Sequence, residues 1–283
     1  RLAIDRWPLF VAGNDEIAMS LYEQLIASSV GLVARMEGGT QLVRSEAGKA
    51  CVRALGFGDD EAMLPYGPRS FEGYRLLQEY FAFPSRYMFV ELCGLGSIVA
   101  RCPAEELDLY ILLEREDPTL ARAIDGSRLL PFCAPAINLF PREADRIHLS
   151  GREHEYQVIA DRARPIDYEV HSVTRVVGYG SQADGQHEFL PMYGARDPAI
   201  RRNARAYYTV QRSPRLLSSK ARAAAPRSTY VGSEVFVSLV DEDHGPHRPE
   251  LRQLGVSMLC PNRDLPLQMP IARGGSDFSL QSG

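Results

Sequence analysis

Apolar side chains recur every three or four positions between residues 71 and 83, as they do on one face of an amphipathic helix. Ser70 is a residue type favoured at a helix N-cap and Pro84 cannot continue a helix, so we expect the helix to lie between them. An apolar face of this width is expected to lie against a sheet or a partner protein. The expected apolar face comprises Tyr74, Leu76, Leu77, Tyr80, Phe81 and Phe83, and the expected solvent face comprises Glu72, Arg75, Gln78 and Glu79.

The segment that follows this helix, Tyr87–Leu92, is apolar on both faces apart from Glu91, which predicts a central strand. Earlier in the chain, Asn14 is expected to cap another helix, which Gly31 ends. Together with the neighbouring strands these elements predict an α+β domain of residues 1–120, in which two helices lie on a mostly antiparallel sheet. The other strands are expected at Arg1–Val11, Gly31–Met36, Gln41–Arg44, Cys51–Phe57 and Leu107–Leu113.

The helical period almost disappears after Pro118 and Gly126, and short alternating segments take its place. The polar, glycine-containing stretch Gly178–Ala206 is interpreted as an exposed loop. This half therefore predicts a β-rich domain of residues 121–283, built as a sandwich or an open barrel. Its strands are expected at Ile147–Leu149, Tyr156–Ala160, Tyr168–Gly178, Tyr207–Val210, Ser228–Val240 and Leu254–Cys260.

Composition places the chain among globular proteins, because 45% of its 283 residues are hydrophobic and 24% are charged. Its net charge of −4 argues against a nucleic-acid binder that depends on bulk electrostatics. Only two of the 32 basic residues are lysines, and arginine is the cation better suited to interfaces and buried pairs. The five cysteines form no CxxC motif and are expected to be reduced and buried. No apolar run approaches 18 residues, and the start within a strand-like segment predicts a fragment of a longer protein.

Two short motifs resemble parts of known sites but lack the residues that would complete them. The Gly94-Leu95-Gly96 turn follows a strand, as in dinucleotide-binding proteins, but the rest of that fingerprint is missing. His148 and His154 flank a glycine turn and are interpreted as exposed hairpin residues in preference to a metal pair. Neither motif predicts catalysis or a cofactor.

The segment Asp241–His247 is the densest group of possible metal ligands, and it leaves two alternative functions open. It lacks the spacing of a calcium loop and is interpreted as a solvated loop. A metal-dependent hydrolase that uses this segment remains one alternative. A carbohydrate-binding β-sandwich is the other, although the single tryptophan, Trp7, lies in the α+β half and argues against it.

Arginine clusters with aromatic residues and prolines where strands are expected to begin, as at Pro65–Arg69 and Pro226–Tyr230. Such segments are stiff and present guanidinium and phenol groups, which are typical of protein interfaces. They are equally compatible with structural corners of a β-fold.

Six blocks of the sequence, in order, resemble the TssF (VasA/ImpG) family of baseplate proteins of the bacterial type VI secretion system. Six ordered blocks are far more specific than any single motif in the chain. The segments Gly94–Glu106 and Gly178–Arg205 fit the family pattern poorly, so no contacts are carried over for them. The blocks are Leu64–Phe83, Pro135–Arg142, Glu155–Val173, Pro226–Asp241, Leu251–Pro266 and Gly274–Phe278.

The resemblance implies a structural role without catalysis or cofactor, on the cytoplasmic side of the injection machine. Family members build the wedges of the baseplate with TssG and TssE. The resemblance further implies contacts with TssK, with the spike protein VgrG and with a second copy of TssF. It implies no nucleic-acid partner and no membrane insertion. Within the matching blocks, the residues expected to be structural or interfacial are Arg227, Tyr230, Arg252, Asn262 and Arg263.

Overall fold

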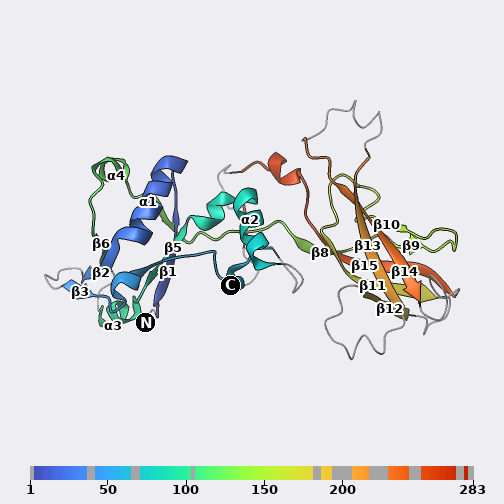
Figure 1. Cartoon of the computed structure of the whole chain (residues 1–283), viewed down its shortest axis with the longest axis horizontal. Coiled ribbons are helices and arrows are strands. Elements are labelled where there is room, and N and C mark those ends of the chain that lie inside the picture. Colours follow the sequence, from blue (N-terminus) through green and yellow to red (C-terminus); the bar gives the residue numbers. More distant parts are fainter. Residues whose placement is uncertain are drawn as a thin grey trace. The chain divides into compact units, whose positions relative to one another are not determined.

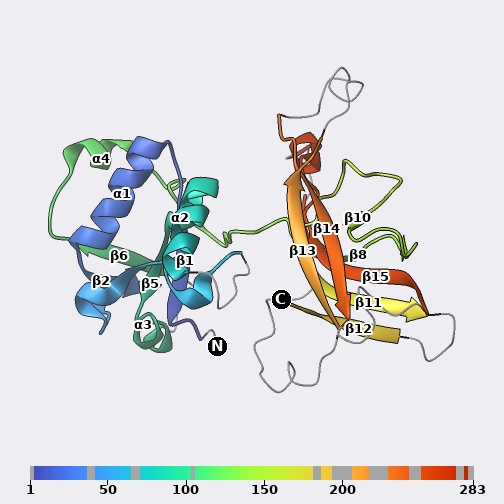
Figure 2. The ribbon, with the colours of Figure 1, turned by 45° about the vertical axis from the view of Figure 1, so that its right-hand side comes forward.

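The structure is a computed structural model, shown in Figures 1 and 2, and the chain forms two compact units, Arg1–Ile137 and Asn138–Gly283. Each unit has its own hydrophobic core, and the predicted α+β class is confirmed. The proposed division into domains of residues 1–120 and 121–283 stays a prediction. The described residues are 3–36, 42–64, 71–102, 106–180, 186–192, 206–216, 229–241, 250–271 and 277–279.

The first unit contains two antiparallel sheets. One has the strand order β4-β5-β1-β7 and comprises β4 (Val52–Ala54), β5 (Phe89–Cys93), β1 (Arg6–Val11) and β7 (Leu129–Pro131). The other has the order β3-β2-β6 and comprises β3 (Leu42–Arg44), β2 (Ser29–Met36) and β6 (Leu107–Leu113). The helices of this unit are α1 (Asp15–Ser28), α2 (Glu72–Ala82), α3 (Gly96–Arg101) and α4 (Pro118–Ala123), with 3-10 turns at Gly48–Cys51, Asp59–Glu61 and Pro84–Tyr87.

Several local predictions for this unit are confirmed. The side chain of Asn14 caps α1 by accepting a hydrogen bond from the Ile17 N–H at 3.3 Å. Strand β5 lies between β4 and β1, and its first four residues are buried, as expected of a central strand. The prediction that Gly31 ends α1 is wrong. The helix ends at Ser28, because β2 begins at Ser29 and pairs along its length with β6.

Helix α2 differs most from its prediction. Arg75 and Glu79 of the expected solvent face are buried and most of the expected apolar face is exposed, whereas Gln78 is exposed as predicted and Leu76 is half-buried. Arg75 and Glu79 are only 4% and 3% exposed, whereas Phe81 is 80% exposed. The helix begins at Glu72 with Phe71 in the N-cap position, and Ser70 lies outside the described residues. The short helices α3 and α4 were not predicted.

The described strands of the second unit form one eight-stranded sheet. Seven of them follow the order β10-β14-β13-β12-β11-β15-β8, and the eighth, β9, pairs with β15. Its core is formed by alternating side chains, including Val235, Val237, Val256 and Met258, as the sequence pattern predicts. Its strands are β8 (Phe140–Glu143), β9 (Ile147–His148), β10 (Tyr156–Val158), β11 (Ser172–Gly180), β12 (Gln186–Pro191), β13 (Ala206–Pro214), β14 (Ser233–Asp241) and β15 (Leu251–Cys260), with a 3-10 turn at Leu265–Gln268.

The sheet curls, since the Asp145 N–H next to β9 bonds the Ile159 carbonyl next to β10 at 3.0 Å. The prediction of one exposed loop over Gly178–Ala206 is wrong at β12. This strand pairs with both β11 and β13 and buries Phe189, while its other residues are mostly polar, which hid it in the sequence. All five cysteines are free, and Cys51 and Cys260 are buried. Among the described residues, no helix is long and apolar enough to span a membrane.

Candidate interaction surfaces

The buried face of α2 carries an ion pair that also binds the backbone of the neighbouring segment, residues 57–64. Arg75 Nη1 lies 3.4 Å from Glu79 Oε2, one helical turn away. The second guanidinium nitrogen of Arg75 donates to the Phe57 and Gly58 carbonyls at 3.4 and 3.2 Å. Glu79 Oε1 accepts hydrogen bonds from the backbone N–H groups of Met63 and Leu64 at 2.9 and 3.4 Å. Each charge therefore satisfies backbone groups of residues 57–64, which explains why this polar face is turned inward.

The opposite face of α2 is apolar and exposed. Its side chains are between 44% and 80% exposed, and they form a nearly continuous aromatic surface, because Tyr80 packs edge-on against Phe81 and Phe71 against Tyr74. Large contiguous apolar patches of this kind mark interaction sites on soluble proteins. We call this surface the aromatic face, and it consists of Phe71, Tyr74, Leu77, Tyr80, Phe81 and Phe83.

The aromatic face continues into a groove of about 670 Å³ between α1 and α2. Its walls come from Met19 and Tyr22 on α1 and from Leu77 and Tyr80 on α2. We call it the α1–α2 groove. The remaining lining residues are Phe10, Val11, Gly13, Asp15, Ala18, Phe57, Leu76, Pro84, Ser85, Tyr87 and Met88.

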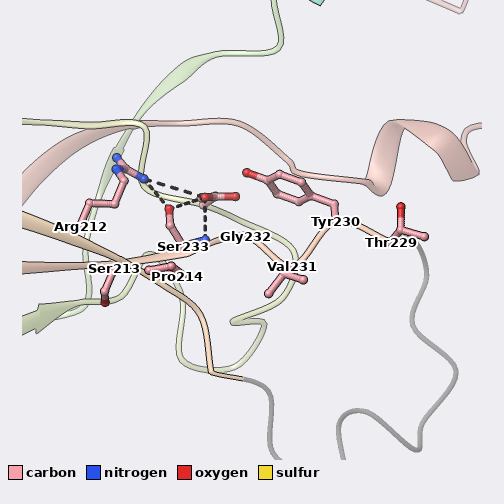
Figure 3. A pocket seen from close by; sticks show the side chains of 9 residues that line it. Arg212, Ser213, Pro214, Thr229, Tyr230, Val231, Gly232 and Ser233 are labelled. Carbon is pink, nitrogen blue, oxygen red and sulfur yellow. Dashed lines mark hydrogen bonds and ion pairs between the residues drawn. The ribbon is translucent and has the colours of Figure 1, made fainter.

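In the second unit, a buried carboxylate gathers groups from several distant segments. Glu169 is 7% exposed, and its Oε1 accepts hydrogen bonds from the Ser233 N–H at 2.9 Å and the Ser233 hydroxyl at 2.6 Å. Arg212 donates to the Ser233 hydroxyl at 2.6 Å and lies 3.9 Å from Glu169. Figure 3 shows Arg212, Ser233 and Tyr230 directed toward the same point, at the wall of an open pocket of about 680 Å³. We call Glu169, Arg212, Tyr230, Ser233 and Arg263 the Glu169 cluster.

Two of the predicted site residues, Tyr230 and Arg263, belong to this cluster. Arg263 donates to the carbonyls of Ile166, Tyr230 and Val231 at 3.1, 3.1 and 3.3 Å, and its guanidinium carbon lies 5.5 Å from the centre of the Tyr230 ring. Its φ of +51° is unfavourable for a residue with a side chain, by about 1 kcal/mol. Its guanidinium is nevertheless fixed by three carbonyls and a cation–π contact. Tyr230 and Arg263 thus lie together at a corner of the fold.

The chemistry of the cluster keeps Glu169 ionised. Burial acts to raise the pKa of Glu169 and is the largest single influence on it. Hydrogen bonds from Ser233 and Tyr230, together with the charge of Arg263, outweigh burial, so the pKa is lowered. Gly232 completes the corner, since it adopts a φ of +80° and an added Cβ would lie 3.2 Å from Arg263 and 3.3 Å from Glu169.

The structure does not bring the other predicted residues into this cluster. Arg252 is exposed on β15, and Asn262 is half-buried and accepts a backbone hydrogen bond from Leu265 at 3.1 Å. Arg227 lies outside the described residues. Sequence reasoning missed Glu169 and Arg212, although a lone carboxylate between Tyr168 and Val170 was a usable signal of a buried charge.

The residues considered as metal ligands are dispersed where they are described. His148 and His154 are both exposed, and Asp241 is buried at the end of β14, 3.8 Å from His187. Residues 242–249, which hold the rest of the Asp241–His247 segment, lie outside the described residues. Within the described ranges, no group of three or more His, Cys, Asp or Glu residues could hold a metal ion.

Comparisons with known proteins agree on one family. The model of the family described as "Type VI secretion system, TssF" matches residues 1–283. The chain is 50% identical over 280 residues to the type VI secretion system component TssF1 of Pseudomonas aeruginosa, covering 99% of this chain and 45% of that protein. It also resembles a chain in the cryo-electron microscopy structure of the type VI secretion system TssK-TssF-TssG baseplate subcomplex, with a TM-score of 0.67 and 25% identity over 92% of this chain and 44% of that one.

The chain therefore spans less than half the length of the relatives it matches. The family match nevertheless extends over the whole sequence, and the resemblance of the six ordered blocks is confirmed. On these grounds, the chain belongs to the TssF family of the type VI secretion system.

Proposed function

We propose that the chain is a structural part of a type VI secretion baseplate, where it holds partner proteins in fixed positions and performs no catalysis. The observation that carries this proposal is the aromatic face of α2, whose six large apolar side chains remain exposed while Arg75 and Glu79 of the same helix are buried. A surface of this kind is unfavourable in water and favourable in a protein interface, where aromatic side chains contribute much of the binding energy.

The proposed partner proteins rest on two different observations. TssK and TssG are named with TssF in the similar baseplate subcomplex, and we propose them as direct partners of this chain. TssE, VgrG and a second copy of TssF follow from the family resemblance alone. We place the assembly on the cytoplasmic side of the secretion machine for the same reason.

The Glu169 cluster supports a scaffold role because it stiffens the loops that precede β14 and follow β15. Tyr230 and Arg263 act there as structural residues, and we propose Arg227, Arg252 and Asn262 as interface residues. A preformed surface loses less conformational entropy when it binds than a flexible one, so such corners favour stable assembly.

Co-purification tests this function directly. The chain is co-expressed with TssG and TssK, and the Tyr74→Ser/Phe81→Ser variant is compared with the unaltered protein by affinity purification and size-exclusion chromatography. We expect the unaltered chain to form a complex and the variant to lose at least about tenfold in affinity, because two exposed aromatic anchors are removed.

The matched control is Phe132→Ser, which removes an aromatic side chain that is 94% exposed but lies outside the aromatic face. It is expected to leave binding unchanged. An unaltered chain that binds neither TssG nor TssK contradicts the proposed function. Unchanged binding by the double variant contradicts the role of the aromatic face.

A further inference from the structure

The α1–α2 groove has the length and the lining of a site for two turns of a helix. Its lining residues on α1 run from Asp15 to Tyr22, at helical spacing, which corresponds to about 10 Å along the axis. Its walls and floor are otherwise aromatic or aliphatic, apart from Gly13, Ser85 and the single charged residue Asp15. Such a groove accepts large apolar side chains that recur every three or four positions along a partner helix.

The groove is lined mainly by helical segments, which present side chains and no open strand edge among the described residues. Its only contribution from a strand is the end of β1, which already pairs with β5 and β7, and the Val11 N–H bonds the Met88 carbonyl at 2.8 Å. An extended segment would therefore leave its own N–H and C=O groups unpaired against apolar side chains, which is costly. A helix satisfies its backbone internally and avoids this cost.

Asp15 is the charged residue that lines the groove, and the half-buried Arg128, whose guanidinium lies against the lining residue Gly13, is 3.9 Å from Asp125. Glu16 is exposed next to Asp15 in the first turn of α1. Two further exposed carboxylates follow shortly after the lining residue Phe57: Asp59, which lies 3.9 Å from Arg75, and Asp60. The arginines on the α2 side, Arg75 and Arg86, are buried and bonded to backbone carbonyls of residues 57–61. A partner is thus attracted by carboxylates without repulsion from these cations.

We propose that the α1–α2 groove binds an amphipathic helix of a partner protein, with large apolar side chains facing Tyr22, Leu77 and Tyr80 and a lysine or arginine facing Asp15. This inference rests on the proposed function, because it names the chemistry of one contact within that assembly. It assigns the groove to a helix of another protein, and a second copy of this chain is a competing outcome.

Photo-crosslinking identifies the occupant. The photoreactive residue p-benzoylphenylalanine replaces Tyr80 in the groove or, as the matched control, the exposed Phe132, and each chain is purified in complex with TssG and TssK. After irradiation, mass spectrometry locates the linked peptide. We expect the Tyr80 position to link to a helical, lysine- or arginine-containing segment of TssG or TssK, and the Phe132 position not to link to that segment.

A pair of charge variants tests whether the cationic side chain of the partner helix faces Asp15. Asp15→Asn and Glu16→Gln each remove one carboxylate from the first turn of α1, but only Asp15 lines the groove. We expect Asp15→Asn to weaken binding about threefold and to reduce its salt dependence, and Glu16→Gln to have a clearly smaller effect on both. Equal effects of the two variants would overturn the assignment of the cationic group to Asp15.

The outcomes separate this inference from the proposed function. A complex with TssG and TssK that forms normally but links through Tyr80 to an extended segment, to a second copy of this chain or to nothing overturns the inference alone. A chain that forms no complex with either protein contradicts the proposed function.

Discussion

Glu169 shows how one buried charge organises loops that are far apart in the sequence. Its partners come from β13, from the approach to β14 and from the turn after β15. A buried cluster of this kind is weak evidence for high stability, because the desolvation cost of the charges offsets their mutual attraction. Removing one member is costly, since its partners remain buried without compensation. The cluster therefore specifies a geometry more than it adds stability.

Replacing Glu169 by glutamine is expected to lower the free energy of unfolding by about 2 kcal/mol, because hydrogen bonds to a charged acceptor are replaced by weaker ones. Urea denaturation followed by fluorescence measures the change. The control is Glu188→Gln, because Glu188 is 52% exposed and pairs with the equally exposed Arg175. That variant is expected to change stability by less than about 0.5 kcal/mol. Equal losses in both variants would contradict the special role of Glu169.

The lowered pKa of Glu169 predicts an acid-sensitive contribution to stability. A carboxyl whose pKa is lower in the folded state binds protons more readily when unfolded. Its stabilising effect is therefore complete above the unfolded value of about 4.3 and is lost as pH falls through the lower, folded pKa. Urea midpoints between pH 7 and pH 3 measure this loss. The acid-induced decrease is expected to be smaller in Glu169→Gln, and a parallel decrease in both proteins would exclude the contribution.

At the scale of a single element, α2 reverses the usual relation between side-chain polarity and burial. Its aliphatic and aromatic residues cover the outside, and its Arg75–Glu79 pair replaces a hydrophobic contact with the rest of the unit. The pair is stable there because each charge also binds backbone groups of residues 57–64. Stability and partner binding are thus carried by opposite faces of the same helix.

This reversal predicts very unequal losses of stability for two nearby substitutions in α2. Arg75→Met is expected to lower the free energy of unfolding by about 3 kcal/mol, since it leaves Glu79 buried without its cation. Leu77→Ser, on the exposed face, is expected to change it by less than about 0.5 kcal/mol. Thermal and urea denaturation of the two variants measure these changes in the free energy of unfolding. A larger loss for Leu77→Ser would show that the aromatic face is buried within the unit.

At the scale of the whole molecule, the two units have separate hydrophobic cores. Strand β7 pairs with β1, and Leu120 of α4 is part of the first core, so residues as far as β7 belong to the first unit. Each unit is larger than the smallest independently stable domains and has its own regular sheets. We propose on these grounds that the chain consists of two domains.

Separate expression tests the two-domain proposal. Fragments 1–137 and 138–283 are each expected to unfold in a single cooperative transition, measured by circular dichroism during heating. Fragment 1–120 is expected to be less stable than 1–137, because it lacks β7 and the second half of α4. A fragment that shows no cooperative transition would contradict the proposal for that half.

Much of the secondary structure was accessible from the sequence, because helical and strand periods are local properties. The Asn14 cap, the bounds of β6 and the alternating core face of β15 all follow from side chains close to one another in the chain. Strand β12 was missed because only Phe189 among its six residues is fully buried, too little for a recognisable alternation. The family resemblance was recognised from ordered blocks of sequence, so it required no knowledge of the fold.

The sequence by itself determined the class of fold, most strand positions, the positions of α1 and α2, and the family. It also showed that α2 has one apolar and one polar arc, but a helical period cannot tell which arc faces the core. Only the tertiary structure decided this, because the backbone groups that satisfy Arg75 and Glu79 lie at positions 57–64, outside the helix. The same holds for the Glu169 cluster, whose members are brought together only when β13, β14 and the turn after β15 meet.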